Sequence, residues 1–129
     1  MHILCHIPCN LPQETDALSF MQQVKQMMNC GCIRHTDATH CTVRRVALCG
    51  GAGSSLINSA VAARADIFIT GEIGYHPFFG HEQEIILAEI GHYESEQHTK
   101  TIFCDVITKK FPTFATYYTN VDTNPIKYL

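Results

Sequence analysis

The fold of this chain is decided by one stretch, residues 43–55, which reads VRRVALCGGAGSS. Its first half becomes fully apolar toward Cys49, which is typical of a strand covered on both faces. Its second half is rich in glycine, and the apolar positions Ile57, Ala60 and Val61 then recur at helical spacing. The stretch therefore predicts a strand, a tight loop and a helix, which together form one unit of an α/β fold.

The same alternation continues toward the carboxyl terminus. Apolar runs at 66–70 and 85–90 predict two more strands, and each run stops at a glycine. The apolar positions in 102–111 predict a long helix that ends before proline, because the residue before a proline is disfavoured in a helix. The aromatic and β-branched run 114–119 predicts a further strand.

Before the deciding stretch, the pattern predicts a helix and two short strands. Thr15 is expected to cap a helix that ends near 29–31, and strands at 32–36 and 42–49 are expected to be joined by a polar turn. Residues 1–12 contain two prolines and are expected to form either an edge strand or a connecting arm. The whole chain, 1–129, thus predicts a single α/β domain, a three-layer α/β/α arrangement with a largely parallel or mixed sheet.

Composition limits the possible functions. The chain has 129 residues, a net charge of −3 and 46% hydrophobic residues, so it has no basic excess of the kind that direct nucleic-acid binding needs. No apolar run is long enough for a membrane span, and the start lacks a signal peptide. Seven cysteines, an odd number, predict reduced thiols and a cytoplasmic location. Eight histidines point to metal or acid–base chemistry.

Three glycine-led loops, at 50–55, 71–76 and 91–96, each follow an apolar strand. In an open parallel sheet, ligands bind outside the carboxyl ends of the strands. The polar residues in the middle of the chain concentrate in these loops. We therefore expect the functional site at this edge of the sheet.

The first loop contains Gly50, Gly51, Gly53 and Ser54. Backbone N–H groups in such a loop can surround an anion at the start of a helix. The loop matches neither the Walker pattern nor the dinucleotide fingerprint. Anion or substrate binding and a purely structural strand-to-helix turn both stay open.

The second and third loops each contain a histidine and a glutamate four residues apart. These pairs are Glu72 with His76, and His92 with Glu96. Neighbouring pairs of this kind suit Zn²⁺, Fe²⁺ or Mn²⁺, which accept mixed nitrogen and oxygen ligands. Each has a structural alternative, because Glu96 can favour the first turn of a helix through its charge and His76 can be a half-buried, backbone-bonded histidine.

Several stretches together resemble one known family. These are VALCGGAGSS (46–55), DIFITGEIGYH (66–76), GHYESE (91–96) and NPI (124–126). They resemble, in order and spacing, the carboxyl-terminal half of the NIF-three-like family, whose members are also called GTP cyclohydrolase I type 2 homologues or dinuclear metal centre proteins. The resemblance extends over residues 10 to 129.

The resemblance implies one half of a duplicated fold, in which two similar α/β halves intertwine around two metal ions. It implies that His92 and Glu96, in the pattern G-H-x-x-x-E, are metal ligands, and that Glu72 and His76 line the same cleft. It also implies a homo-oligomer, from dimer to hexamer. The family's tandem histidines and first half are absent from this sequence. We therefore expect a fragment or a stand-alone half, with the amino-terminal half supplied in cis or in trans.

Two functions follow as expectations. The first is a metal-dependent hydrolase acting on a nucleotide or phosphate-bearing substrate, with an active site that is incomplete in this chain alone. In it, His92 and Glu96 hold metal, and Glu72 or His76 positions water or moves protons as the catalytic group. The alternative is a non-catalytic binding, regulatory or oligomer-assembly module without bound metal. A half whose missing partner leaves apolar surface exposed should also self-associate.

Overall fold

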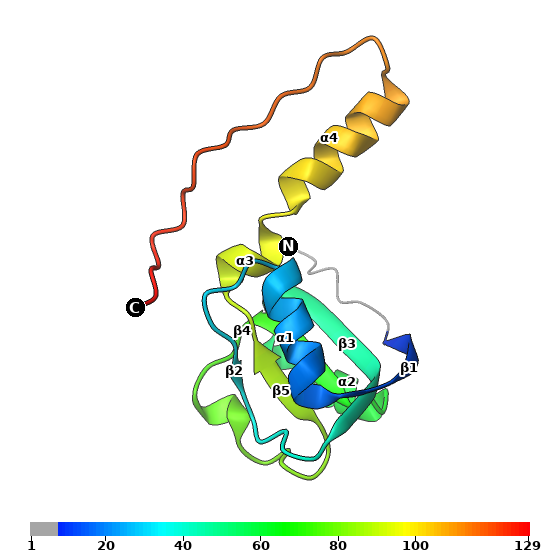
Figure 1. The fold of residues 1–129 in the computed structure, drawn as a ribbon, viewed down its shortest axis with the longest axis vertical. Helices are drawn as coiled ribbons and strands as arrows, with labels where there is room; N and C mark the ends of the chain where they lie inside the picture. The colour runs from blue at the N-terminus through cyan, green and yellow to red at the C-terminus, as the bar shows by residue number, and fades with distance from the viewer. Residues whose placement is uncertain (1–7) are drawn as a thin grey trace.

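The computed structural model describes residues 8–129, and its centre is a five-stranded mixed sheet with the order β1-β3-β4-β5-β2 (Figure 1). The strands are β1 (Cys9–Asp16), β2 (Arg34–His35), β3 (Thr42–Ala52), β4 (Ile67–Glu72) and β5 (Ile86–Glu89). Strands β3, β4 and β5 are parallel, and the two edge strands run antiparallel to them.

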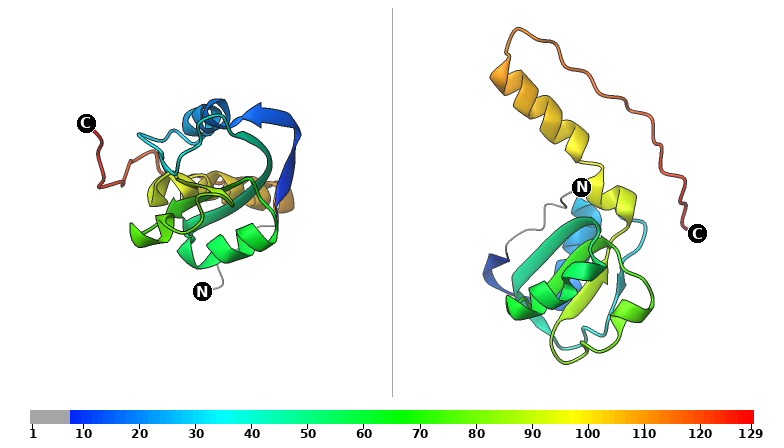
Figure 2. Two further views of the ribbon diagram at one scale, coloured as in Figure 1. Left: turned by 90° about the horizontal axis from the view of Figure 1, so that it is seen from below. Right: turned by 180° about the vertical axis from the view of Figure 1, so that it is seen from behind.

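The helices are α1 (Ala17–Met27), α2 (Ile57–Ala62), α3 (His92–Glu96) and α4 (Thr99–Lys110), with 3₁₀ turns η1 (Ser54–Leu56) and η2 (His76–Phe78). Helices α1 and α2 cover opposite faces of the sheet (Figure 2). This confirms the α/β class and its layers. Helix α4 extends away from the sheet, and the residues after it turn back and run toward α3 (Figures 1 and 2).

The core lies on both faces of the sheet because side chains alternate along a strand. In β4, Ile67 and Ile69 pack in the cluster that contains α1. The residue between them, Phe68, packs in the cluster that contains α2. All three are fully or almost fully buried, so the apolar run in β4 is used on both sides.

Helix α1 begins one residue later than the sequence predicted. Thr15 is the penultimate residue of β1, and Asp16 caps the helix by accepting a hydrogen bond from the Ser19 backbone N–H at 2.8 Å. This bond lowers the pKa of the Asp16 carboxyl. Threonine and aspartate can both cap a helix. Because β1 continues to Asp16, Asp16 and not Thr15 stands directly before α1.

Two strand predictions were wrong. The strand at 32–36 shortens to β2, which pairs with β5 and not with β3 as a hairpin would. Arg34 holds it there, because its guanidinium forms an ion pair with Glu89 and donates to the Ile73 carbonyl at 2.7 Å. The run 114–119 forms no strand, because it has no neighbouring strand to pair with.

The amino-terminal segment was expected to be an edge strand or a connecting arm. Residues 9–12 lie in β1, at the edge of the sheet next to β3, and residues 1–7 lie outside the described residues. Across the described part of the chain, no helix combines the length and apolar character that crossing a membrane requires.

Candidate metal centre

Three of the side chains singled out in the sequence meet at the carboxyl end of the sheet. The His92 Nδ1 atom lies 3.0 Å from Glu72 Oε2, and its Nε2 atom lies 3.5 Å from Glu96 Oε2. Each side chain is about half exposed, with 49%, 62% and 54% of the surface of His92, Glu72 and Glu96 accessible. The imidazole therefore lies between two carboxylates, open to solvent.

The fold brings these residues together from two elements. Glu72 is the last residue of β4, and His92 is the first residue of α3, which begins just after β5. Because β4 and β5 are parallel neighbours, their carboxyl ends lie at the same edge of the sheet. Glu96 joins His92 because residues four apart share one face of a helix.

Ser95 connects α3 to the end of β3 through hydrogen bonds. Its Oγ atom accepts a hydrogen bond from the Gly51 N–H at 2.9 Å and donates one to the His92 carbonyl at 2.8 Å. On the other side of Gly51, its carbonyl accepts from the buried Thr70 hydroxyl at 3.0 Å. The backbone around the site is thus fixed by two hydroxyl groups.

Gly51, near the end of β3, lies close to the side chains of His92 and Glu96. Its φ is +68°, and a Cβ atom at this position would lie 2.8 Å from Glu96 Oε1 and 3.5 Å from His92 Nε2. A side chain here would contact His92 and displace the Glu96 carboxylate. The positive φ independently favours glycine.

The donor set matches part of a metal site. Two ligands bonded at about 2.1 Å with an angle of about 90–110° lie about 3.0–3.4 Å apart, and His92 Nε2 and Glu96 Oε2 are 3.5 Å apart. Glu72 occupies the other ring nitrogen, as the orienting carboxylate of a metal-binding histidine does. Within residues 8–129, no three His, Cys, Asp or Glu side chains converge on one metal position.

His76 does not reach this cluster. It begins η2, where its ring packs edge-on against Tyr75 with centroids 5.6 Å apart. In the described part of the chain, no hydrogen bond or ion pair joins it to Glu72, His92 or Glu96. Of the two predicted pairs, His92 with Glu96 is brought together, whereas Glu72 contacts His92 and not His76.

The glycine-rich stretch is less of a loop than the sequence predicted. Gly50 and Gly51 lie in β3, which extends to Ala52. The Gly51 N–H already donates to Ser95, and a Cβ atom at Gly53 would overlap the Thr70 hydroxyl. Ser54 Oγ donates to the Glu72 carbonyl at 3.5 Å. Packing and hydrogen bonding thus account for Gly51 and Gly53. Anion binding by residues 50–54 stays a prediction.

Sequence reasoning missed two residues beside the site, Glu94 and Asn124. Glu94 is buried, and its Oε1 atom accepts a hydrogen bond from Asn124 Nδ2 at 3.1 Å. An acidic residue in the first turn of a helix is ordinarily explained by the helix dipole. The presence of a glutamate at position 94 therefore did not indicate a buried hydrogen bond. The available signal was the pairing of GHYESE with the distant NPI, both of which contributed to the family resemblance.

A family model described as Duf34/NIF3 (NGG1p interacting factor 3) matches residues 5–125 of the chain. The chain belongs to this family. The relatives agree with it: a Staphylococcus epidermidis protein named GTP cyclohydrolase 1 type 2 homolog is 27% identical over 113 residues, which is 84% of this chain and 31% of that protein. The chain therefore spans about a third of the length of the curated relatives it matches.

Solved structures share the fold of this family member. A Staphylococcus aureus protein superposes with a TM-score of 0.81 at 21% identity, over 95% of this chain and 41% of its own. A Bacillus cereus protein related to NIF3 gives a TM-score of 0.77 at 23% identity, over 95% of this chain and 35% of its own. The fold described above is thus that of a part of these longer proteins.

Proposed function

We propose that His92 and Glu96 bind a divalent metal ion, Zn²⁺, Fe²⁺ or Mn²⁺, in a metal-dependent hydrolase that acts on a nucleotide or phosphate-bearing substrate. The observation that carries this proposal is the convergence of His92 Nε2 and Glu96 Oε2 at 3.5 Å, while Glu72 holds the opposite ring nitrogen at 3.0 Å. The names of the relatives, which refer to GTP cyclohydrolase, support the substrate class.

Each side chain has a distinct task in this proposal. Glu72 accepts a hydrogen bond from the Nδ1–H group of His92. This keeps the proton on Nδ1 and leaves the Nε2 lone pair available for a metal ion. Glu96 adds a negative charge that draws a cation to the same position. A metal ion bound there would supply Lewis acidity and an activated water. The remaining ligands come from outside the described residues 8–129, and relatives that match this chain are about three times as long.

The exposed carboxylate of Glu72 has a second oxygen that can hold a water molecule or accept a proton near the substrate. This assigns to Glu72 the catalytic role that the sequence left open between Glu72 and His76. His76 lies outside the contacts of the cluster, which makes it the weaker candidate.

The experiment is metal analysis after incubation with Zn²⁺, Mn²⁺ or Fe²⁺ and dialysis. His92→Ala and Glu96→Gln should each lower the bound metal at least tenfold, and Glu72→Gln should lower it less, because it acts through the ring. A matched control exists in His81 and Glu84, an imidazole–carboxylate pair at 3.0 Å outside the site. His81→Ala should leave the metal content unchanged, and equal metal in all four variants would overturn the ligand assignment.

A second function, a non-catalytic binding or assembly module, is favoured by a separate observation. Helix α4 exposes an apolar stripe formed by Ile102, Phe103, Val106 and Ile107. Exposed apolar surface of this kind marks an interaction site. The family description itself names an interacting factor. As such a module, the chain would form an oligomer or bind an amino-terminal half. It would not hydrolyse nucleotides.

Light scattering and a turnover assay separate the two functions. Phe103→Lys should lower the average mass of the chain in solution, and Thr101→Lys, which adds the same charge on the other side of α4, should not. Metal-dependent hydrolysis of GTP would count against the non-catalytic module. A monomeric wild-type chain at all concentrations would count against assembly through α4.

A further inference from the structure

Glu94 is a buried carboxylate that the proposed metal site does not use. Only 6% of its surface is accessible, although it lies between His92 and Glu96 in the sequence. Two residues along a helix correspond to a rotation of about 200°, so Glu94 points to the opposite side of α3 from these ligands. A polar group buried in this way needs a hydrogen-bond partner.

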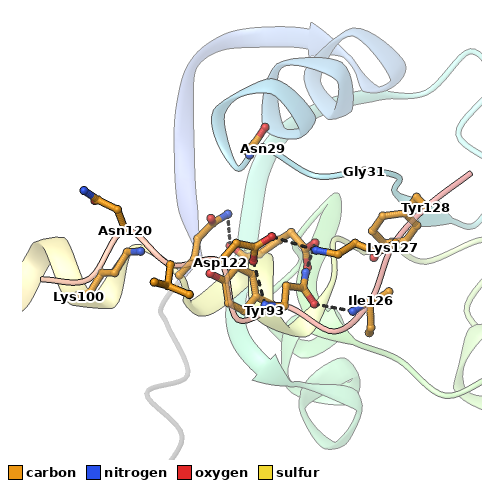
Figure 3. Close-up of a pocket in the computed structure, with 13 residues that line it drawn as sticks. Asn29, Gly31, Tyr93, Lys100, Asn120, Asp122, Ile126, Lys127 and Tyr128 are labelled. Atoms are coloured by element: carbon orange, nitrogen blue, oxygen red, sulfur yellow. Dashed lines mark hydrogen bonds and ion pairs between the residues drawn. The ribbon is translucent and has the colours of Figure 1, made fainter.

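The partner of Glu94 is the side chain of Asn124, in the carboxyl-terminal part of the chain. Asn124 Nδ2 donates to Glu94 Oε1 at 3.1 Å, and Asn124 Oδ1 accepts from the Ile126 N–H at 3.1 Å. The Asn124 N–H in turn donates to Asp122 Oδ1 at 2.9 Å. The Asn124 side chain thus links the Ile126 backbone to α3, and the Asn124 backbone N–H closes the turn at Asp122. Figure 3 labels Asp122 and Ile126, the two ends of this turn.

The fastened turn forms one wall of a cavity of about 400 Å³ whose other wall is α3. Pro125 and Ile126 come from the turn, and Tyr93 comes from α3. His92 and Glu96, the metal ligands of the proposed function, lie at its edge. This volume is in the range of small-molecule sites, which combine apolar walls with a few convergent polar groups.

We propose that the hydrogen bond between Glu94 and Asn124 positions the turn 124–126 as the apolar wall of a binding site, and that this site takes the ring of an aromatic phosphate whose anionic group reaches the metal position at His92 and Glu96. Glu94 is a positioning residue, since it bonds to the turn and does not line the cavity. Asn124 holds the turn and also lines the cavity, so the double variant below, which keeps a side chain of the same shape at position 124, separates the two roles. The proposal rests on the proposed function, because the anionic end requires the metal position.

The cavity on the other side of the turn is a weaker candidate for the ligand. It measures about 490 Å³ and is lined mainly by polar residues, among them Asn29, Asn120 and Lys127 (Figure 3). Its two lysines already have partners, since Lys127 forms an ion pair with Asp122 at 3.0 Å and Lys100 Nζ donates to the Thr119 carbonyl at 3.4 Å. This second cavity also does not include His92 or Glu96. The apolar cavity is therefore the one that a ring bound next to the metal position would enter.

The test compares phenyl phosphate with inorganic phosphate by calorimetry on the full 129-residue chain in the presence of Mn²⁺. Wild type should bind phenyl phosphate at least tenfold more tightly than inorganic phosphate. Asn124→Asp removes the amide donor and places a carboxylate against Glu94, so it should weaken phenyl phosphate at least tenfold and inorganic phosphate less than twofold. Glu94→Gln keeps an accepting oxygen and should change either affinity less than threefold.

The double variant Glu94→Gln, Asn124→Asp is the decisive control. It exchanges donor and acceptor while keeping both shapes, and the aspartate can still accept from the Ile126 N–H. It should restore phenyl phosphate binding to within threefold of wild type. Hydrogen exchange in residues 120–129 should be faster in Asn124→Asp alone and should return to the wild-type rate in the double variant.

The outcomes separate this inference from the function on which it rests. Equal affinity for the two phosphates, an unchanged phenyl phosphate affinity in Asn124→Asp, or no restoration in the double variant would overturn the positioning role. The proposed metal site is judged independently, by the metal content of His92→Ala. If phenyl phosphate binding changes as expected in the three variants but survives EDTA, the positioning role of Glu94 and Asn124 is supported and the metal-dependent part of the proposal is overturned.

Discussion

The sheet body (residues 8–96) and the carboxyl-terminal segment (residues 97–129) use apolar residues in opposite ways. In the sheet body, the apolar runs of β3, β4 and β5 are almost entirely buried, against α1 on one face and α2 on the other. In the carboxyl-terminal segment, no residue is buried. Its exposed apolar residues include Ile102, Phe103, Val106, Ile107, Phe111, Phe114, Tyr117, Tyr118 and Val121.

This difference separates what holds the fold together from what is available to a partner. Burial of apolar surface contributes about 25 cal/mol per Å², so the stability of this chain comes from the sheet body. The apolar face of α4 contributes little while it is exposed, and contributes more once another surface covers it. Apolar sequence thus forms a core in the sheet body and an exposed face in α4.

The largest expected effect comes from removing the same aromatic ring in each region. Phe68 is 1% exposed in β4 and Phe103 is 62% exposed in α4. Phe68→Ala should lower the free energy of unfolding by about 3–5 kcal/mol, because it leaves a cavity in the core. Phe103→Ala should change it by less than about 0.5 kcal/mol.

Urea denaturation followed by circular dichroism measures both variants. The comparison between the two regions fails if Phe103→Ala costs as much as Phe68→Ala. Such a result would mean that α4 is packed against something in solution, and light scattering would then show an assembly whose mass falls in the variant.

The sequence predicted the centre of the sheet well, because each central strand is an apolar run that ends at or near glycine. It could not predict the partner of β2, since two residues carry no pairing signal and their place is set by the distant contact of Arg34 with Glu89. It wrongly predicted a strand at 114–119, because β-propensity describes a fit to neighbours that are absent there.

For the site, four-residue spacing predicted that His92 and Glu96 would lie together, and α3 confirms their proximity. The third member, Glu72, reaches His92 only because β4 and β5 are parallel neighbours. The same spacing at His76 predicted a contact that is not formed, because η2 begins at that residue and turns the chain away. A four-residue spacing predicts a side-chain contact only where the residues lie in one helix, as His92 and Glu96 do in α3.

The second prediction concerns Gly91, where the sheet body connects to the site. Both Gly91 (φ +98°) and Gly80 (φ +90°) have a left-handed backbone, but only a Cβ atom at Gly91 would overlap the Glu94 carboxylate. Gly80→Ala should cost about 1–2 kcal/mol of backbone strain. Gly91→Ala should cost about 2–4 kcal/mol, because Glu94 must also move from its buried position.

Chemical denaturation of the two glycine variants gives these values, and metal binding gives a second readout. We expect Gly91→Ala to lower metal content as well, since Gly91 directly precedes α3 and His92. If the two substitutions cost the same, packing around Glu94 is looser than the structure indicates.

A smaller effect is expected from a single hydroxyl group. Thr70 is fully buried and donates to the Gly51 carbonyl at 3.0 Å, whereas Thr101 is exposed on α4. Thr70→Val keeps the shape but leaves a buried carbonyl without its donor, so it should cost about 1–2 kcal/mol. Thr101→Val should change stability by less than about 0.5 kcal/mol, and a thermal melt of both variants tests the difference.

The last prediction concerns Tyr128, which touches the sheet body near the end of the carboxyl-terminal segment, as Asn124 does at Glu94. Tyr128 lies against Gly31, so closely that a Cβ atom there would overlap its ring, and Cys30 is buried next to it. Burial, together with the nearby charges of Glu94 and Cys32, raises the pKa of the Cys30 thiol from 9.0 to about 11. The native chain therefore keeps a proton that the unfolded chain loses, so stability present below pH 9 should be lost as the pH rises toward 11.

The same shift should make Cys30 slow to react with iodoacetamide at pH 8, about a hundredfold slower than a thiol of ordinary pKa, because only the thiolate reacts. Exposed Cys32 should be labelled before Cys30, as mass spectrometry can show. Tyr128→Ala should speed the labelling of Cys30 several-fold by opening its cover, and Phe114→Ala, which removes an exposed ring from the same segment, should not. Equal rates in the two variants would mean that the last residues do not rest on the sheet body in solution, and the division between the two regions would then begin directly after α3.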